Sequence, residues 1–198
     1  SIAATGMLAQ QTNVDVIANN IANMNTTGYK RFRPEFQDLL YQNLRRVGAE
    51  SSDTGTIVPS GVQIGVGVKT ASVYRITEQG NLISTGNTLD VAIQGTGYFQ
   101  VLLPSGTNAF TRAGSFQLSA QGQIVTADGF TVSPGITLPT DAVDITINAN
   151  GTVQAKIDGQ VTPQTVGTLD LVSFANGAGL ESIGGNLLLE TPTAGAPT

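Results

Sequence analysis

The sequence predicts a mainly β protein that begins with one long amphipathic helix. Two observations lead to this prediction. Apolar residues in the first 24 positions recur at alternating spacings of four and three, the heptad pattern of a helix that packs in a coiled coil. From residue 68 onward, turn-forming residues recur about every ten positions between short apolar runs, which is typical of a β-sandwich or a barrel-like domain.

The N-terminal helix is expected over residues 2–24. Gln10 is a polar interruption of its heptad seam, and Asn19, Asn20 and Asn23 are expected on its outer, polar face. An isolated helix of this length is marginal in water, whereas burial of the seam contributes on the order of 10 kcal/mol. The seam therefore requires a partner, either in its own domain or on another subunit. Its apolar residues are Ala3, Met7, Val14, Ile17, Ile21 and Met24.

A connector is expected over residues 29–70, after a turn-rich Asn-Thr-Thr-Gly cluster that ends the helix. Because Pro34 can occupy a first helical turn, a short helix is expected from about Pro34 to Arg46. Glycines exclude a long helix from residues 47–67, which are expected to form an extended arm or a loop. Since the β region begins only beyond this connector, another subunit is expected to cover the seam. The arm residues expected to contact other subunits are Arg45, Arg46, Val58, Pro59, Val62 and Ile64.

The sequence therefore divides into an N-terminal helix over residues 1–28, the connector over residues 29–70 and a β-rich outer domain over residues 71–198. The Gly- and Pro-rich tail from Ala175 to Thr198 is expected to be loop-like. Strands are expected at Val68–Ile76, Leu89–Ile93, Tyr98–Leu103, Ala109–Arg112, Phe116–Leu118, Ile124–Val125, Phe130–Val132, Ile145–Ile147, Val153–Ile157 and Leu169–Phe174.

Charge is scarce in this chain and unevenly distributed. Charged residues make up 12% of the sequence and the net charge is −5, so a nucleic-acid-binding protein is not expected. A low charge content suits a protein that packs against its own copies. The positive charges gather between Lys30 and Arg46, whereas the β-rich remainder is acidic. This basic segment is either a solvated connector or a patch that faces acidic neighbours in an assembly.

The sequence contains no constellation of residues that is typical of an enzyme. It has no Cys and no His, which excludes disulfides, thiolate nucleophiles and imidazole bases within the chain. Gly95-Thr96-Gly97 lacks the third glycine of a dinucleotide site, and Asp141 and Asp144 are more typical of exposed loop charges than of an acid–base pair. No enzymatic activity, cofactor or metal is therefore expected. Membrane insertion is not expected either, because no stretch reaches about 18 apolar residues.

Two motifs near the N-terminus carry a resemblance to a known family. The run Ala-Asn-Asn-Ile-Ala-Asn over residues 18–23 precedes Thr-Thr-Gly-Tyr-Lys-Arg over residues 26–31. Together they resemble the N-terminal signature of the flagellar rod and hook axial proteins. Later runs, including residues 59–68, 90–99 and 179–187, extend the resemblance over nearly the whole chain and are most similar to distal-rod members. The motif residues are Asn19, Asn20, Asn23, Thr27, Gly28, Tyr29 and Lys30.

The resemblance implies a self-assembling structural subunit outside the cytoplasm. In this family the N-terminal helix pairs with a C-terminal helix in the inner layer of a tube, and the β domain lies at larger radius. The second helix is expected beyond Thr198. The implied partners are copies of the chain, the proximal rod, the hook and the surrounding ring proteins. The implied location is the flagellar basal body, from the periplasm to the outer membrane, reached through the flagellar secretion channel.

Three alternatives remain open on the sequence. A hook subunit usually carries an extra outer β domain, for which this chain has no room, and a proximal-rod subunit should lack the arm over residues 47–67. A secreted β-rich adhesin or carbohydrate-binding module would need exposed aromatic platforms. Aromatic residues are only 6% of the sequence and Trp is absent, so that third class is disfavoured.

Overall fold

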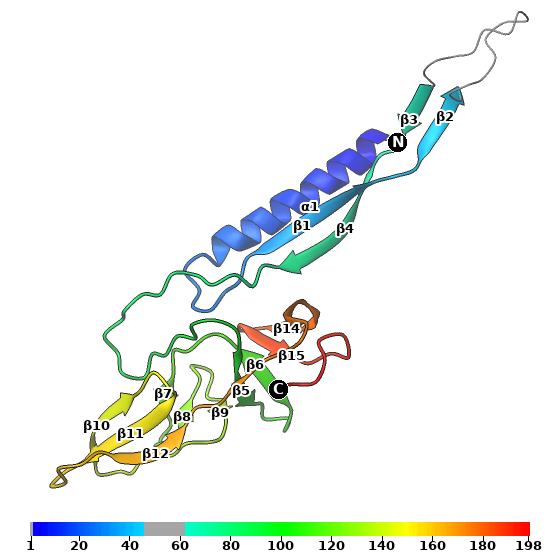
Figure 1. Cartoon of the computed structure of the whole chain (residues 1–198). Coiled ribbons are helices and arrows are strands. Elements are labelled where there is room, and N and C mark those ends of the chain that lie inside the picture. Colours follow the sequence, from blue (N-terminus) through cyan, green and yellow to red (C-terminus); the bar gives the residue numbers. More distant parts are fainter. Residues whose placement is uncertain (1, 46–61) are drawn as a thin grey trace, which may run out of the picture. The chain divides into compact units, whose positions relative to one another are not determined.

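The computed structural model describes residues 2–45 and 62–198 (Figure 1). The chain folds into two compact units. The first, here called the helix–hairpin unit, spans Ser1–Met24 and Arg31–Ile76. The second, the β unit, spans Asn25–Lys30 and Thr77–Thr198. The short segment that follows the N-terminal helix thus belongs to the β unit, although the residues on both sides of it belong to the other.

The helix–hairpin unit combines one helix with a long two-stranded ribbon. Helix α1 (Ile2–Ala22) contacts both β1 (Phe32–Asp38) and β4 (Val68–Arg75), which pair antiparallel (Figure 1). Hydrogen bonds from Leu39 N to Gly67 O and from Val66 N to Leu40 O continue the ribbon. It extends into the antiparallel pair of β2 (Tyr41–Arg45) and β3 (Val62–Gly65).

The short helix expected from about Pro34 to Arg46 is wrong, because residues 32–38 and 41–45 form strands β1 and β2. The apolar residues of this segment fit strand pairing as well as they fit a helix, and their partners come from the distant residues 62–75. Pro34 lies opposite Val73. Every strand of a two-stranded sheet is an edge, where a proline without an N–H is tolerated.

The β unit contains two antiparallel sheets among its described residues. The larger has eight strands in the order β14-β15-β6-β5-β9-β8-β7, with β13 also paired to β5; the smaller has the order β10-β11-β12. The strands are β5 (Tyr98–Leu102), β6 (Asn108–Thr111), β7 (Gln117–Leu118), β8 (Ile124–Val125), β9 (Thr131–Val132), β10 (Ala142–Ile147), β11 (Thr152–Ile157), β12 (Gln164–Thr168), β13 (Leu171–Val172), β14 (Glu181–Gly184) and β15 (Leu187–Leu189), and a 3-10 turn spans Gly177–Gly179.

Side-chain alternation along the central strands gives the β unit two hydrophobic clusters. Phe99 and Val101 of β5 enter the larger cluster, where the rings of Phe99 and Phe116 meet edge to face at 5.0 Å. Tyr98, from the same strand, enters the smaller cluster together with Phe110. Neighbouring residues of one strand thus point to opposite sides, as the two-residue period of a strand requires. Strand β5 is therefore buried on both of its faces.

Most of the expected strands of the β unit are present, but the tail differs from the prediction. The loop-like tail expected from Ala175 to Thr198 is wrong, because it contains β14 and β15 and contributes the buried Leu187 and Leu188 to the core. The strand expected at Leu89–Ile93 is also wrong: only an isolated bridge between Asp90 and Ser115 forms there. The apolar run Val91–Ile93, between Asp90 and Gln94, is too short to identify a strand by periodicity.

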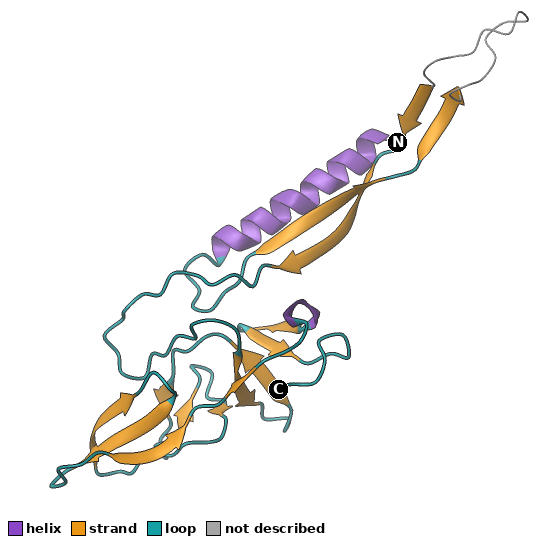
Figure 2. Ribbon diagram, in the orientation of Figure 1, coloured by secondary structure: helices purple, strands orange, loops and turns teal. Residues whose placement is uncertain are grey.

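The described residues therefore form a mainly β protein with one N-terminal α-helix (Figure 2). This confirms the fold class that the sequence predicts, without showing a coiled coil. The observed helix ends at Ala22, two residues before the expected end at Met24. In the described part of the chain, no helix has the length and apolarity needed to cross a membrane.

Candidate functional site

The apolar seam of α1 is exposed in the single chain. Met7, Val14, Ile17, Ile21 and Met24 retain 47–73% of their accessible surface, and Ala3 is exposed as well. Leu8, beside the seam, is 63% exposed. All the expected seam residues therefore lie together on one uncovered face of the helix–hairpin unit, within the part of the chain that the structure describes. Their packing against other subunits stays a prediction.

The opposite side of α1, which is the less exposed one, carries small and polar residues. Ala9 is the buried residue of the helix, and Thr5, Val16 and Asn20 are half-buried. Thr5 lies so close to the ribbon that a Cβ added at Gly67, where φ is +127°, would overlap its Oγ1 atom. Small side chains thus permit the close approach of helix and strands. The larger apolar residues remain on the outside.

Asn20 of the first motif fastens α1 to strand β1. Its Nδ2 atom donates to Phe32 O at 2.8 Å, and its Oδ1 atom accepts from Phe32 N at 2.9 Å. The side-chain amide thereby pairs with both backbone groups of one residue at the start of the strand. Asn20 does not lie on the outer polar face, where the sequence placed it. The sequence lacked the signal for this role, because the role requires that β1 folds back beside the helix.

Asn23 has a more local role in the same motif. Its Nδ2 atom donates to Asn19 O at 2.9 Å, and its backbone N–H donates to the same oxygen at 3.2 Å. Both bonds serve the last turn of α1, where helix carbonyls lose their regular partners. The Ala-Asn-Asn-Ile-Ala-Asn run thus ends the helix and attaches it to β1.

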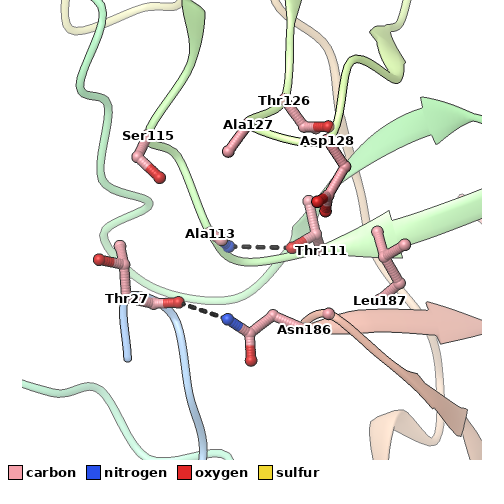
Figure 3. Close-up of a pocket in the computed structure, with 10 residues that line it drawn as sticks. Thr27, Thr111, Ala113, Ser115, Thr126, Ala127, Asp128, Asn186 and Leu187 are labelled. Carbon is pink, nitrogen blue, oxygen red and sulfur yellow. Dashed lines mark hydrogen bonds between the residues drawn. The ribbon is translucent and has the colours of Figure 1, made fainter. Parts of the chain in front are cut away.

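Residues 26–30 of the second motif lie in the β unit. Asn186, from the turn between β14 and β15, donates its Nδ2 atom to Thr27 O at 2.9 Å (Figure 3). Gly28 has φ +74°, and a Cβ added there would lie 2.6 Å from Ala113 N. Lys30 donates its Nζ atom to Glu78 O. Three of the predicted motif residues are therefore brought together against loops of the β unit.

Arg112 organises the loops beside this segment and was not among the predicted site residues. Its Nη1 atom donates to Gly97 O at 2.8 Å and its Nη2 atom to Gly95 O at 2.8 Å. The guanidinium also lies 5.9 Å from the centre of the Tyr98 ring. It lies in a Phe-Thr-Arg-Ala-Gly-Ser-Phe run over residues 110–116. A single arginine among uncharged neighbours is the signal that could have indicated its structural role.

Two cations of this region, Arg112 and Lys30, have pKa values below their usual ones. Burial lowers the pKa of Arg112, and Tyr98 acts in the opposite direction. Burial also lowers the pKa of Lys30, and the positive charge of Arg112 lowers it further. Burial and the neighbouring Arg112 thus both disfavour the charged form of Lys30.

A pocket of about 270 Å³ lies beside the Asn186–Thr27 contact (Figure 3). Its polar side chains are four hydroxyls, the carboxylate of Asp128 and the amide of Asn186. Thr111 Oγ1 is already engaged, since it accepts a 3.1 Å hydrogen bond from Ala113 N. Among the described residues, no group of three or more His, Cys, Asp or Glu side chains could hold a metal ion. The pocket is lined by Thr27, Thr111, Ala113, Ser115, Thr126, Ala127, Asp128, Gly185, Asn186 and Leu187.

The expected arm is described only at its base. Arg45 of β2 pairs with Val62 of β3, and Ile64 is 45% exposed. Arg46, Val58 and Pro59 lie outside the described residues. The base of the arm also exposes the large apolar side chains Leu40, Tyr41 and Leu44. Two-stranded ribbons are marginally stable alone in water, so this base has an uncovered surface as well as a weak core.

Comparison with known proteins gives consistent matches along the chain. Family models described as "Flagella basal body rod protein" and "Flagellar hook protein FlgE/F/G D1 domain" match residues 1–30 and 92–155. The flagellar basal-body rod protein FlgG of Caulobacter vibrioides is 62% identical over 196 residues, which are 99% of this chain and 75% of that protein. FlgG of Agrobacterium fabrum is 54% identical over 197 residues, with 100% and 75% covered. The flagellar hook protein FlgE of Treponema pallidum is 44% identical over 122 residues, 61% of this chain and 26% of that protein.

Proposed function

Because this chain belongs to the family of the flagellar basal-body rod protein FlgG, and is a structural flagellar subunit and not an enzyme, we propose that its copies assemble helically into the distal rod. The assembled rod would be a rigid hollow shaft that transmits torque and encloses an export channel. The observation that carries this proposal is the uncovered seam of α1.

The seam supports assembly because it is exposed and is apolar at every seam position except Gln10. Burial of an apolar side chain of the size of Val, Ile or Met contributes about 1.5–3 kcal/mol. Contacts between different patches of identical subunits generate open helical filaments when their rotation does not close a ring. A helix of another copy, or a C-terminal helix of the kind that the family resemblance implies, is the proposed partner, packed in the manner of a coiled coil.

The arm is proposed to brace neighbouring subunits. Its base exposes Tyr41, Leu44 and Ile64, and a two-stranded ribbon gains stability when another surface covers it. Residues 45–67 would then stiffen the tube. Deletion of residues 47–63 should give rods of lower bending stiffness in electron micrographs. Rods of unchanged persistence length would refute this role.

The proposed partners of the assembled chain are the axial proteins on either side and the surrounding rings. Rod and hook proteins share the family models that match here, which supports contacts with the proximal rod and the hook. A location from the periplasm to the outer membrane, reached through the flagellar secretion channel, follows from a place in the rod. The hook reading is disfavoured, because the hook relative matches only 26% of its own length.

The test of assembly is electron microscopy of the full-length protein after concentration. Straight hollow tubes are the expected result, and a protein that stays monomeric at every concentration would refute the proposal. Val14→Glu places a charge on the seam, whereas Val161→Glu makes the same change at a 95% exposed residue of the β unit. Burial of an unpaired charge costs several kcal/mol, so Val14→Glu should prevent tube formation and Val161→Glu should permit it. Equal assembly of both variants would exclude the seam as the interface.

A further inference from the structure

Residues 25–30 connect α1 to β1, and their composition is that of an ordinary turn. They nevertheless belong to the fold of the β unit, which holds them at three separate points.

The first point is Asn186, whose backbone conformation gives a reason for its side chain. Its φ is 59°, in the left-handed region, and it follows Gly184 and Gly185, which also have positive φ. Glycine would adopt this conformation at no steric cost, and asparagine is among the residues that tolerate it. What asparagine adds is the amide that donates to Thr27 O at 2.9 Å.

The second point is Gly28, where two backbones meet directly. Its φ is +74°, and an added Cβ would lie 2.6 Å from Ala113 N and 2.8 Å from Ala113 Cα. A side chain is excluded there both by conformation and by space. The segment is thus seated against the chain between β6 and β7, with no room for another residue type.

The third point is Lys30, at the end of the segment. Its Nζ atom donates to Glu78 O, just after the chain re-enters the β unit at Thr77. One residue away, within the helix–hairpin unit, Ile76 N donates to Arg31 O at 2.9 Å. The segment that leaves the β unit after Lys30 and the segment that re-enters it at Thr77 are therefore hydrogen-bonded to each other in both units.

We infer that Thr27, Gly28 and Lys30 form a docking segment that the β unit holds, and that Asn186 is the positioning residue that orders this segment. This assigns a role to the Thr-Thr-Gly-Tyr-Lys motif. The docking is a property of the single chain and lies within the β unit.

The test uses the full chain at concentrations where it is monomeric, so its result does not depend on assembly. Asn186→Gly keeps the left-handed backbone and removes the amide. Asn176→Gly is the matched control, because Asn176 Nδ2 donates to another backbone oxygen of the β unit, Thr193 O, at 3.1 Å. Amide hydrogen exchange over residues 27–30 should become roughly five- to tenfold faster in Asn186→Gly, the effect of one lost hydrogen bond, and stay unchanged in Asn176→Gly.

A second readout separates positioning of the segment from a contact that only adds stability. The chain has no cysteine, so Asn25→Cys beside the docking segment and Gln121→Cys elsewhere in the β unit give a specific pair of spin-label sites. The distance distribution between the labels should broaden in Asn186→Gly and in Lys30→Gln, and keep its width in Asn176→Gly. The inference is overturned if Asn186→Gly matches Asn176→Gly in exchange over residues 27–30 or in the width of that distribution.

Discussion

The Asn20 side chain forms two hydrogen bonds with the backbone of Phe32, at 2.8 and 2.9 Å. This is the geometry by which one strand pairs with another, supplied here by a helix side chain. It satisfies the first backbone groups of β1 and attaches α1 to a ribbon whose core is small. The helix–hairpin unit therefore depends on a polar contact where larger units depend on apolar packing.

Asn20→Ala should lower the free energy of unfolding of the helix–hairpin unit by about 1–3 kcal/mol, because it removes both part-buried hydrogen bonds to the Phe32 backbone. Alanine favours the helix more than asparagine does, which offsets the loss by about 0.5 kcal/mol. The measurement is denaturant unfolding followed by circular dichroism. Gln11→Ala, at an exposed position of the same helix, is the control and should be neutral or slightly stabilising. Equal effects of both substitutions would contradict the contact.

Gly28→Ala should lower the melting temperature of the β unit more than Gly129→Ala does. Both glycines have positive φ, so both substitutions carry the same conformational cost of about 1–2 kcal/mol. A Cβ at Gly28 would also press on Ala113, whereas nothing lies within 4 Å of one at Gly129. The difference between the two melting temperatures measures that close approach, and no difference would argue against it.

Arg112→Lys should destabilise the β unit by about 2–3 kcal/mol, since a single ammonium cannot reach the separate carbonyls that the guanidinium binds. Arg33→Lys, at an exposed position of β1, should change stability by less than about 0.5 kcal/mol. Thermal unfolding of both variants tests this. If Arg112→Lys left the stability of the β unit unchanged, the carbonyls would have to be hydrogen-bonded in another way.

The stability of the β unit should respond to pH through Lys30. Its pKa in the folded chain is below the usual value of 10.5, chiefly because of burial. Between these two pKa values the unfolded chain binds more protons than the folded chain, so this group makes stability rise with pH. The melting temperature of the wild type relative to Lys30→Gln should therefore increase as the pH is raised toward 10.5. A difference that stays constant or falls over this range would contradict the lowered pKa.

The sequence predicts those features that depend on local pattern. The spacing of Met7, Val14 and Ile21 predicted the helix and its apolar face, and turn residues predicted most strands of the β unit. Features that depend on distant pairing were missed. A short helix was expected from about Pro34 to Arg46, because the strand partners of this segment lie in residues 62–75 and no local pattern indicates them.

The roles of the motif residues could not be predicted from the sequence either. Their identity revealed a family, but the roles of Asn20 and Gly28 follow only from the backbones that fold beside them, at Phe32 and Ala113. Arg112 was missed for the same reason, since its carbonyl partners come from a loop without regular structure.

The contact between Asn186 and Thr27 joins residues 159 positions apart in sequence. The entropic cost of closing a chain loop rises with its length, and distant contacts form late when local ones can form first. Helix α1 and the β1–β4 pair involve shorter separations. We therefore expect the docking segment to bind the β unit only after the β14–β15 turn has formed. The hydrogen bond between Asn186 and Thr27 would then mark complete folding.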